Sequence, residues 1–389
     1  MIEAAQFVEA ARRRGFTWYA GVPCSFLTPF INYVLQDPSL HYVSAANEGD
    51  AVALIAGVAL GARNERGVTM MQNSGLGNAV SPLTSLTWTF RLPQLLIVTW
   101  RGEPGVADEP QHALMGPITP ALLETMEIPW EPFPREADGI GPALERAVAH
   151  MDKTGRPYAL VMQKGSVAPY PLAETEPPRA DACAPRTQWL GAPQDGLPAR
   201  RDALERVIAR TPLDSTVVLA STGFCGRELY ALADRPNQLY MVGSMGCVMT
   251  LALGLSLARQ DLHVVALDGD GAALMRMGSF ATLGAYGHSN LTHLLLDNAS
   301  HDSTGGQATV SSQVSFAAIA AACGYASAIE GDDLALVDTL LARSRRDGVP
   351  DRPHFARLTI RRGTPDGLPR PTMTPADVKA RLMRHIGAA

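Results

Sequence analysis

The sequence predicts an α/β protein of two domains, each built on a mainly parallel β-sheet flanked by helices. Three observations predict this fold class. The chain has 389 residues, which suits two or three domains. Short apolar runs alternate with helical patterns in both halves, as expected for parallel strands that are covered on both faces. Residues 166–199, between the halves, are rich in Pro, Ala and Gly without periodicity, so we interpret them as a linker.

The first predicted domain comprises residues 1–165. It begins with MIEAAQFVEAARRRG, whose apolar spacing predicts an amphipathic helix rather than a signal peptide. A second helix is predicted in EGDAVALIAGVALGAR, where Val52, Ile55 and Leu60 have helical spacing. Strands are predicted in the apolar runs FTWYAGVP, LHYVS, GVTMMQNSGLGN, LPQLLIVTWRG and RPYALVMQKG.

The second predicted domain comprises residues 200–389. Helices are predicted in RRDALERVIART and DVKARLMRHIGA, and strands in STVVLASTG, QLYMVGSMG, HVVALDGDG and LTHLLLDN. The longest apolar stretch, Met245 to Ala258, is interrupted by Thr250 and Ser256. It is too short to cross a bilayer, so we expect a buried helix there.

Composition and charge argue against several function classes. A formal net charge of −5, without a block of Lys or Arg, disfavours nucleic acid as a partner. No membrane span is predicted, so a membrane is not an expected partner either. The five cysteines are odd in number and widely spaced, which predicts neither a disulfide framework nor a zinc site. A reducing, cytoplasmic location is therefore expected.

Two predicted strands end in oxygen-bearing polar residues. Asp270 follows one apolar run within Gly-Asp-Gly, and Asn298 follows the next, with 25 residues (272–296) between Gly271 and Asp297. This spacing suits a helical crossover to a nearby parallel strand. Ligands bind beyond the carboxyl ends of parallel strands, and carboxylate and amide oxygens suit Mg²⁺. Gly-Asp-Gly alone is more often a strand-ending turn, but the pair favours a metal site.

This pairing resembles the signature of thiamine diphosphate (ThDP) enzymes. The resemblance implies two domains of the ThDP-binding fold, with ThDP and Mg²⁺ as cofactors. It also implies that Asp270, Asn298 and the backbone carbonyl of Ser300 hold Mg²⁺ on the diphosphate. Asp297 stands where many members have a first asparagine, whereas the ligand position Asn298 is intact.

Further parts of a ThDP site match the same family. The pattern N-E-G-D-A marks Glu48 as the activating glutamate, although Glu48, like Asp50, also suits a first helical turn without any cofactor. The G-S-M-G loop makes Met245 the apolar wedge under the cofactor, although a core methionine is the alternative. The glycine loop of the first domain includes Gly77 and Asn78. The other implied cofactor-binding positions are Gly75, Thr222, Gly223, Ser244, Gly269, Gly271 and Ala272.

The chain resembles the compact phosphonopyruvate and sulfopyruvate decarboxylase family, because a short linker replaces the central domain of larger ThDP enzymes. The phrases GVPCSFLTPF, DEPQH, GSMG and HDSTGGQ carry this resemblance. It implies a pyrimidine-binding domain at 1–165, a diphosphate-binding domain at 200–389, and a homodimer or higher homo-oligomer with sites at subunit interfaces. One departure is Phe224, since related sequences often have a lysine there. A direct lysine–phosphate contact at that point is therefore in doubt.

The activity that this resemblance implies is a carboxy-lyase reaction of phosphonate and antibiotic biosynthesis. It converts 3-phosphonopyruvate, a small 2-oxo acid, to phosphonoacetaldehyde and CO₂. His112 in DEPQH and His301 in DNASHDSTGG are candidate acid/base groups, and a structural role is equally compatible with each. Asp302 and the glycines after it are expected to form a flexible lid.

The phosphonate end of such a substrate needs cationic or amide donors, ideally a bidentate arginine. Arg101 in TWRGEP is the first candidate, because it follows a predicted strand end. Ser25, Asn73 and Ser74 are candidate hydrogen-bonding partners. A surface ion pair of Arg101 with Glu103 or Asp108 is the alternative.

Other functions remain as hypotheses. Sulfopyruvate decarboxylation to sulfoacetaldehyde differs only in a sulfonate group, and the sequence separates it poorly from the leading hypothesis. A catalytically silent ThDP-fold protein is disfavoured by the intact Glu48, Asp270 and Asn298. A carboligase is disfavoured by the missing central domain, and a dinucleotide-dependent dehydrogenase by the lack of a clean G-x-G-x-x-G after a strand.

Overall fold

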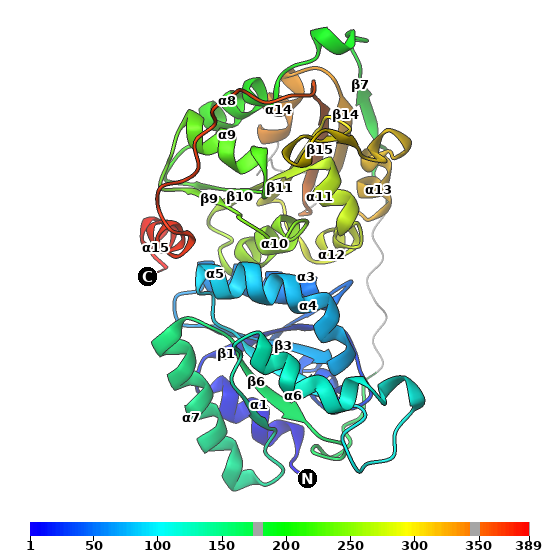
Figure 1. Ribbon diagram of the computed structural model, residues 1–389, viewed down its shortest axis with the longest axis vertical. Helices are drawn as coiled ribbons and strands as arrows, with labels where there is room; N and C mark the ends of the chain where they lie inside the picture. Colours follow the sequence, from blue (N-terminus) through cyan, green and yellow to red (C-terminus); the bar gives the residue numbers. More distant parts are fainter. Residues whose placement is uncertain (174–181, 343–350, 389) are drawn as a thin grey trace. The chain divides into compact units, whose positions relative to one another are not determined.

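The computed structural model describes residues 1–173, 182–342 and 351–388. The chain divides into two compact units, Met1–Pro178 and Arg179–Ala389. Each unit has its own sheet, in which every pair of neighbouring strands is parallel (Figure 1). This confirms the predicted α/β fold class.

The first unit has a six-stranded sheet with the strand order β2-β1-β3-β4-β6-β5. Its strands are β1 (Phe16–Gly21), β2 (His41–Ser44), β3 (Arg66–Gln72), β4 (Leu95–Thr99), β5 (Trp130–Pro132) and β6 (Tyr158–Met162). Its helices are α1 (Ala4–Arg12), α2 (Thr28–Leu35), α3 (Glu48–Gly61), α4 (Leu76–Pro82), α5 (Trp88–Phe90), α6 (Met115–Thr125) and α7 (Ala137–Thr154).

Both faces of this first sheet are buried. Met70 and Ile97 pack into a cluster with residues of α1, α2 and α7. Their chain neighbours Met71 and Val98 pack into a second cluster, with residues of α3, α4 and α6. Successive side chains of a strand point to opposite faces. A strand that is covered on both faces must therefore be apolar throughout, which is why the runs lack polar alternation.

The second unit has a seven-stranded sheet with the strand order β7-β14-β15-β11-β10-β8-β9. Its strands are β7 (Arg186–Gln188), β8 (Thr216–Ala220), β9 (Gln238–Tyr240), β10 (His263–Gly269), β11 (Leu291–Asp297), β14 (Ser327–Gly331) and β15 (His354–Thr359). Its helices are α8 (Arg200–Arg210), α9 (Phe224–Leu232), α10 (Val248–Ala258), α11 (Asp270–Met275), α12 (Ser279–Tyr286), α13 (Phe316–Ala322), α14 (Ala335–Leu341) and α15 (Pro375–His385).

The carboxyl ends of β8, β10 and β11 lie side by side. In the parallel register, Gly269 of β10 pairs with Leu296 of β11, and Leu267 pairs with Ala220 of β8. The residues that follow these strands therefore meet at one edge of the sheet. This confirms the expectation that the two polar strand ends belong to neighbouring strands.

Two predicted irregular segments contain regular structure. Within the predicted linker, Arg186–Gln188 forms β7 and pairs with β14, so this part of the linker belongs to the second unit's sheet. Residues 174–181 of that linker lie outside the described residues. The expected lid contains an antiparallel pair, β12 (Ser300–His301) with β13 (Gln307–Ala308), joined through the short turn Asp302–Thr304.

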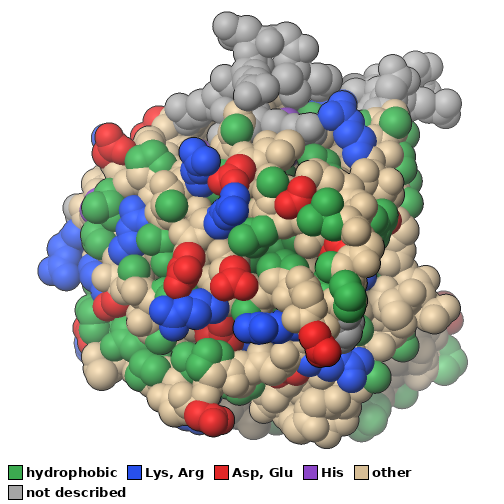
Figure 2. All heavy atoms as spheres, turned by 90° about the horizontal axis from the view of Figure 1, so that it is seen from above, with side chains coloured by type: hydrophobic (Ala, Val, Ile, Leu, Met, Phe, Trp, Pro, Cys, Tyr) green, Lys and Arg blue, Asp and Glu red, His purple; other side chains and the backbone are tan. Residues whose placement is uncertain are grey.

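The charged side chains on the visible surface agree with the absence of a Lys or Arg block in the sequence. On the face drawn in Figure 2, Lys and Arg side chains lie among Asp and Glu side chains instead of gathering into one basic patch.

Within residues 1–173, 182–342 and 351–388, no helix is long and apolar enough to cross a membrane. The apolar stretch at Met245 to Ala258 instead provides α10, which is buried over most of its length.

Candidate functional site

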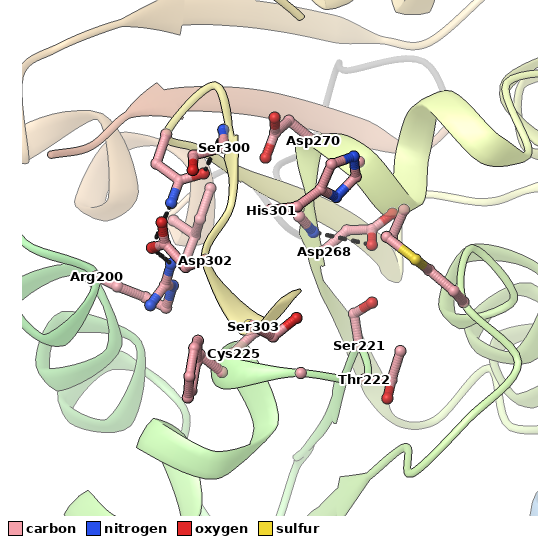
Figure 3. A pocket seen from close by; sticks show the side chains of 18 residues that line it. Arg200, Ser221, Thr222, Cys225, Asp268, Asp270, Ser300, His301, Asp302 and Ser303 are labelled. Carbon is pink, nitrogen blue, oxygen red and sulfur yellow. Dashed lines mark hydrogen bonds and ion pairs between the residues drawn. The ribbon is translucent and has the colours of Figure 1, made fainter. Parts of the chain in front are cut away.

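A pocket of about 70 Å³, room for several water molecules, lies at the carboxyl ends of β8, β10 and β11 (Figure 3). Its lining brings together residues that are far apart in the sequence but follow neighbouring strands. The predicted residues that it gathers are Thr222, Gly223, Met245, Gly269, Asp270, Gly271, Ala272, Asn298, Ser300 and His301. The pocket therefore coincides with the site that the two polar strand ends predicted in the second unit.

Asp270 is the first residue of α11, directly after β10. Its side chain is almost fully buried, and its Oδ2 accepts a 2.5 Å hydrogen bond from the hydroxyl of Thr309. Burial raises the pKa of Asp270 above its ordinary value, although the Thr309 hydrogen bond partly opposes this shift. Burial disfavours the charged carboxylate, so this group would be stabilised by a nearby cation.

Asn298 follows β11 and is held by its own loop. Its amide nitrogen donates to Asp302 at 2.6 Å, while its side-chain oxygen accepts from the backbone N–H of Ser300 at 3.1 Å. Ala299 between them has a φ of +53°, a left-handed conformation that turns the chain sharply. Arg200 forms an ion pair with Asp302 at 3.1 Å, so the Asn298 side chain is anchored from outside the loop.

The neighbouring Asp297 has a structural role. Its carboxylate is 1% exposed and accepts hydrogen bonds from Arg357 at 2.7 Å and from Ser311 at 2.8 Å. It also accepts from the N–H of Ala299 at 2.9 Å. Asp297 therefore shapes the loop, and its departure from the asparagine of many family members leaves the Asn298 position in place.

The donors in this pocket fit a divalent cation that carries a diphosphate. Asp270 and Asn298 contribute hard oxygens from adjacent strands, and the Ser300 hydroxyl is buried without a hydrogen-bond partner among the described residues. Over the same part of the chain, no three His, Cys, Asp or Glu side chains form a metal-binding group. Of the three predicted Mg²⁺ ligands, only Asp270 is of one of these residue types. Asn298 and Ser300 would contribute an amide oxygen and a backbone oxygen.

The glycines of the pocket allow close packing around it. A Cβ on Gly271 would lie 2.5 Å from Cε1 of His301 and 3.2 Å from Cε of Met245, so a larger residue would displace these two side chains. In the G-S-M-G loop, Ser244 and Gly246 both have positive φ, at +52° and +88°. A Cβ on Gly246 would approach a backbone oxygen of α11 to 2.8 Å. The loop thereby holds the Met245 side chain against the Gly-Asp-Gly turn.

An imidazole and a thiol, those of His301 and Cys225, line this pocket. His301 is half-buried, and no hydrogen bond to its ring occurs among the residues that the structure describes. Burial raises the pKa of Cys225 to about 12, so this thiol stays protonated at neutral pH and is a poor nucleophile. Of the two, His301 is the group that is available for proton transfer.

Arg200 is a pocket residue that the sequence analysis missed. Its guanidinium is 9% exposed and bonds to Glu228 at 2.6 Å as well as to Asp302. It also lies 6.0 Å from the ring of Phe224, where related sequences often have lysine. A signal was present, because Arg200 opens α8 and a positive charge is unfavourable at a helix N-terminus. Such a residue usually has a tertiary partner.

Glu48 lies in the first unit, at the start of α3. Asn78 donates a 2.8 Å hydrogen bond to its carboxylate, and a Cβ on Gly75 would lie only 2.5 Å from Glu48 Oε1. The glycine loop predicted to belong to the site therefore does contact this glutamate. Asp50 differs, because it is fully buried and bonds to Asn47 at the helix start. These hydrogen bonds give Asp50 a structural role at the start of α3. Glu48, in contrast, is half-exposed.

Arg101 forms the ion pair that was the alternative to a phosphonate-binding role. Its guanidinium donates to both carboxylate oxygens of Asp108, at 2.8 and 2.6 Å, and the hydrogen bond from Arg101 holds the pKa of Asp108 well below its usual range. Only a long 3.5 Å contact joins Arg101 to Ser25. Glu103 instead accepts from Gln163. The bidentate face of Arg101 is thus already occupied by a carboxylate.

Asn73, a predicted substrate-binding residue, uses its amide nitrogen within the first unit, while its side-chain oxygen has no hydrogen-bond partner among the described residues. The residue is fully buried, and its amide nitrogen donates to the backbone carbonyl of Arg101 at 2.7 Å and to Thr119 at 2.9 Å. Asn73 therefore supports the loop that carries Arg101. Ser74 is exposed, and its hydroxyl accepts a 2.6 Å hydrogen bond from Gln72.

His112 occupies a tightly packed position in the first unit. The residue is 4% exposed, and its Nδ1 is buried without a hydrogen-bond partner among the described residues. A Cβ on Gly102 would lie 2.1 Å from the backbone oxygen of His112, so the two segments are in close contact. The polar side chains of His112, Asn73 and Arg101 thus belong to one region of the first unit.

A family model supports the same interpretation of the second unit. The model described as thiamine pyrophosphate enzyme, C-terminal TPP binding domain, matches residues 222–349. This range contains both polar strand ends and the G-S-M-G loop. Together, the parallel-sheet fold, the pocket and this match define a ThDP-dependent enzyme.

Relatives over the full length of the chain give the particular family. A phosphonopyruvate decarboxylase of Streptomyces viridochromogenes is 45% identical, covering 99% of this chain and 95% of the relative. One of Streptomyces hygroscopicus is 42% identical, covering 98% and 93%. A sulfopyruvate decarboxylase of Methanosarcina acetivorans is 27% identical over 78% of this chain and 77% of that protein. The chain belongs to the phosphonopyruvate decarboxylase family of ThDP-dependent carboxy-lyases.

A solved structure supports the fold. The benzoylformate decarboxylase of Polynucleobacter necessarius matches with a TM-score of 0.67 at 12% identity, covering 93% of this chain and 99% of that chain. At this identity the similarity concerns the fold alone. It agrees with the two parallel sheets and with the ThDP-binding fold expected from the sequence.

Proposed function

We propose that this protein decarboxylates 3-phosphonopyruvate to phosphonoacetaldehyde and CO₂, with ThDP and Mg²⁺ as cofactors. One observation carries the proposal: Asp270 and Asn298 end adjacent parallel strands and line one pocket together with Met245. The full-length relatives named phosphonopyruvate decarboxylase support the choice of substrate.

The second unit is proposed to bind the diphosphate and its metal. Asp270, the side-chain oxygen of Asn298 and the backbone carbonyl of Ser300 would hold Mg²⁺. Met245 would support the cofactor from below, since its side chain lies against the Gly-Asp-Gly turn. Backbone groups of the remaining pocket positions would contact the diphosphate, because glycines let backbone approach an anion closely. Those positions are Thr222, Gly223, Gly269, Gly271 and Ala272, and Ser244, which precedes Met245, is a further predicted cofactor-binding position.

The first unit is proposed to contribute the activating glutamate. The carboxylate of Glu48 would hydrogen-bond the aminopyrimidine ring of the cofactor, as the family resemblance implies. Its position is supported by the hydrogen bond from Asn78 and by the close contact with Gly75. In this assignment residues 1–165 form the pyrimidine-binding domain and residues 200–389 the diphosphate-binding domain.

The reaction breaks the bond between the carboxylate carbon and the carbonyl carbon of the 2-oxo acid. When bound, ThDP supplies an electron sink for the electron pair left on the carbonyl carbon. CO₂ leaves, and the carbonyl carbon then takes a proton to become an aldehyde. We assign this proton to His301, because its ring lines the pocket and makes no hydrogen bond there to a described residue. His112 is the second candidate, with Ser25 and Ser74 as polar groups for the substrate.

The protein is proposed to act as a homodimer or a higher homo-oligomer. Glu48 and Asp270 lie in different compact units, and the resemblance implies that the two halves of one site come from different subunits. A reducing, cytoplasmic location also remains a proposal. It is supported by the cysteines, all five of which are free thiols.

A comparison of substrates tests the proposed activity. The purified protein with ThDP and Mg²⁺ should release CO₂ from 3-phosphonopyruvate with a higher kcat/KM than from sulfopyruvate or pyruvate. Sulfopyruvate is the second candidate, because the relative from Methanosarcina acetivorans is named for it. A higher kcat/KM with sulfopyruvate would replace the proposed substrate, and no CO₂ from any of the three acids would refute the proposed activity.

A further inference from the structure

A second cavity, of about 390 Å³, lies in the second unit next to the cofactor pocket. The two share three lining residues, Thr222, Gly223 and Ser303. Its volume is within the range of about 300–1,000 Å³ that small-molecule sites occupy. Other walls come from α9, from the end of β9 and from the segment Arg370 to Val378. A molecule of modest size can therefore extend from the cofactor pocket into this cavity.

The charged side chains that line this cavity are both cationic. They are Arg227 and Arg370, and no Asp or Glu occurs among the lining residues that the structure describes. Arg370 is exposed and makes no hydrogen bond or ion pair with any described residue. Arg227 donates to the backbone carbonyls of Leu368 and Pro369 rather than to a carboxylate. Two positive charges without a counter-ion in a recess favour an anionic ligand.

Two other arginines, the predicted candidate Arg101 and the pocket residue Arg200, are already paired with carboxylates. Arg101 forms a bidentate pair with Asp108, and Arg200 is bonded to both Glu228 and Asp302. Binding an anion at either arginine would require the displacement of a carboxylate. Arg370 and Arg227 need no such exchange, because neither is paired with a carboxylate among the described residues.

The border between the two cavities is polar. Thr222 lies at the end of β8 and Ser303 in the turn after β12, and neither hydroxyl has a hydrogen bond to a described residue. Gly223 between β8 and α9 has a φ of +95°, a conformation that favours glycine, and this residue places no side chain at the border. The geometry thus offers hydroxyl donors between the cofactor pocket and the two arginines.

We propose that this cavity binds the phosphonate group of the substrate through Arg227 and Arg370. The 2-oxo acid end then reaches past Thr222 and Ser303 into the cofactor pocket. This inference rests on the proposed function, and it moves recognition of the phosphonate from Arg101 to the second unit. A doubly charged tetrahedral group with three oxygens suits two arginine forks and neighbouring hydroxyls.

The test compares five variants of the full-length protein with ThDP and Mg²⁺. Arg370→Met is the main variant, because this side chain has no described partner that the change would strand. Arg227→Met is the second, and Arg101→Met tests the competing site. The matched control is Arg201→Met, an exposed arginine on α8 whose ion pair with Glu205 contributes little. Melting temperature and ThDP affinity are measured for each, to separate binding defects from folding defects.

We expect Arg370→Met and Arg227→Met each to raise KM for 3-phosphonopyruvate about 10- to 100-fold, as for the loss of a charge-assisted hydrogen bond. Arg201→Met should leave KM within about twofold of wild type, and Arg370→Lys should restore most of the loss in Arg370→Met. An unchanged KM in Arg370→Met would overturn the proposal. So would a large rise confined to Arg101→Met.

Methylphosphonate and inorganic phosphate identify the source of the bound anion. We expect methylphosphonate to inhibit competitively with 3-phosphonopyruvate, and calorimetry should show about tenfold weaker binding to Arg370→Met than to wild type. Phosphate that binds through Arg370 but does not compete would make this an effector site and overturn the substrate assignment. If wild type binds methylphosphonate through Arg370 but releases no CO₂ from 3-phosphonopyruvate, the anion site stands while the proposed function and the substrate assignment both fail.

Discussion

The side-chain amide of Asn298 donates a 2.6 Å hydrogen bond to the carboxylate of Asp302. Asp302 is itself held by Arg200 at 3.1 Å, and Arg200 by Glu228 at 2.6 Å. Because the amide nitrogen is committed to Asp302, the side-chain oxygen of Asn298 points away from it. A chain of three buried charges, from three segments of the second unit, therefore decides which end of this amide is presented as a ligand.

The first prediction concerns this chain of charges. Asp302→Asn should weaken Mg²⁺-dependent ThDP binding about 10- to 100-fold, because the carboxylate that pairs with Arg200 and orients Asn298 becomes a neutral, weaker acceptor. The measurement is a Mg²⁺ titration of ThDP binding, which needs no turnover. Asp366→Asn, at an exposed residue, is the control and should behave as wild type. A Mg²⁺ half-saturation in Asp302→Asn equal to that of wild type would contradict the orienting role.

The second prediction uses two glycines of one loop. In Gly75→Ala the new methyl group meets Glu48 at 2.5 Å, so the glutamate must move, whereas Gly77 has open space around it. Gly75 has helical φ and ψ, so alanine suits its backbone and stability should be kept. We expect kcat to fall about 100-fold, the typical effect of misplacing a catalytic group by about 1 Å.

Gly77→Ala should retain nearly all activity and serves as the matched control. Both variants should melt within a few degrees of wild type. If Gly75→Ala is as active as Gly77→Ala, the contact between this loop and Glu48 has no catalytic importance.

The third prediction tests the assembly of the site from two subunits. Glu48→Gln should bind ThDP but lose most turnover, and Asp270→Ala should lose Mg²⁺-dependent ThDP retention. If Glu48 and Asp270 of one site come from different subunits, mixed dimers contain one intact site out of two. Mixing and re-equilibrating the two variants in equal amounts should therefore recover about one quarter of wild-type activity. No recovery, with subunit exchange verified by mass, would place both residues of a site in one subunit.

The fourth prediction concerns pH and the C-terminal helix. Arg381 of α15 donates to both carboxylate oxygens of Asp234 at 2.7 Å. Burial by itself raises the pKa of Asp234, but the hydrogen bonds from Arg381 and Tyr240 outweigh this effect and lower it. A lowered folded-state pKa stabilises the protein above the unfolded value of about 4, and this contribution is lost as pH falls below it.

Asp234→Asn should therefore lower the melting temperature at pH 7, and its difference from wild type should shrink as the pH falls below about 4. The effect should be modest, because this ion pair is partly exposed. Melting curves of both proteins across pH 2 to 8 provide the measurement. A constant difference at every pH would show that Asp234 acts through packing and not through its charge.

The main strands and the two polar strand ends were predictable from the sequence because their signals are local. The runs HVVALDGDG and LTHLLLDN are long and mostly apolar, and each ends in a polar residue that β10 and β11 place at the sheet edge. Three strands of the same sheet, β7, β14 and β15, were not predicted. β15 contains Arg357, a charged residue whose partner is the buried Asp297 of the neighbouring strand. Only the strand pairing explains a cation at that position.

The side-chain networks of the site were not predictable for a similar reason. Arg200 meets Asp302 across 102 residues of sequence, so no local pattern joins them. Arg101 was predicted to face the substrate because it follows a strand end. The structure does place it just after the end of β4. Its pairing with Asp108 depends on how the loop after β4 folds back, and this is decided by tertiary contacts such as that of Asn73. Position was therefore easier to predict than the partner of each polar group.

The cofactor dependence of 3-phosphonopyruvate decarboxylation decides whether the pocket in the second unit is a ThDP site. The protein, freed of cofactors, is incubated with 3-phosphonopyruvate, and phosphonoacetaldehyde and CO₂ are quantified with ThDP, with Mg²⁺, with both and with neither. We expect equimolar phosphonoacetaldehyde and CO₂ only when both cofactors are present. Asp270→Ala should form almost no product under the same conditions. Product formation that is independent of ThDP, or that is unchanged in Asp270→Ala, would contradict this expectation.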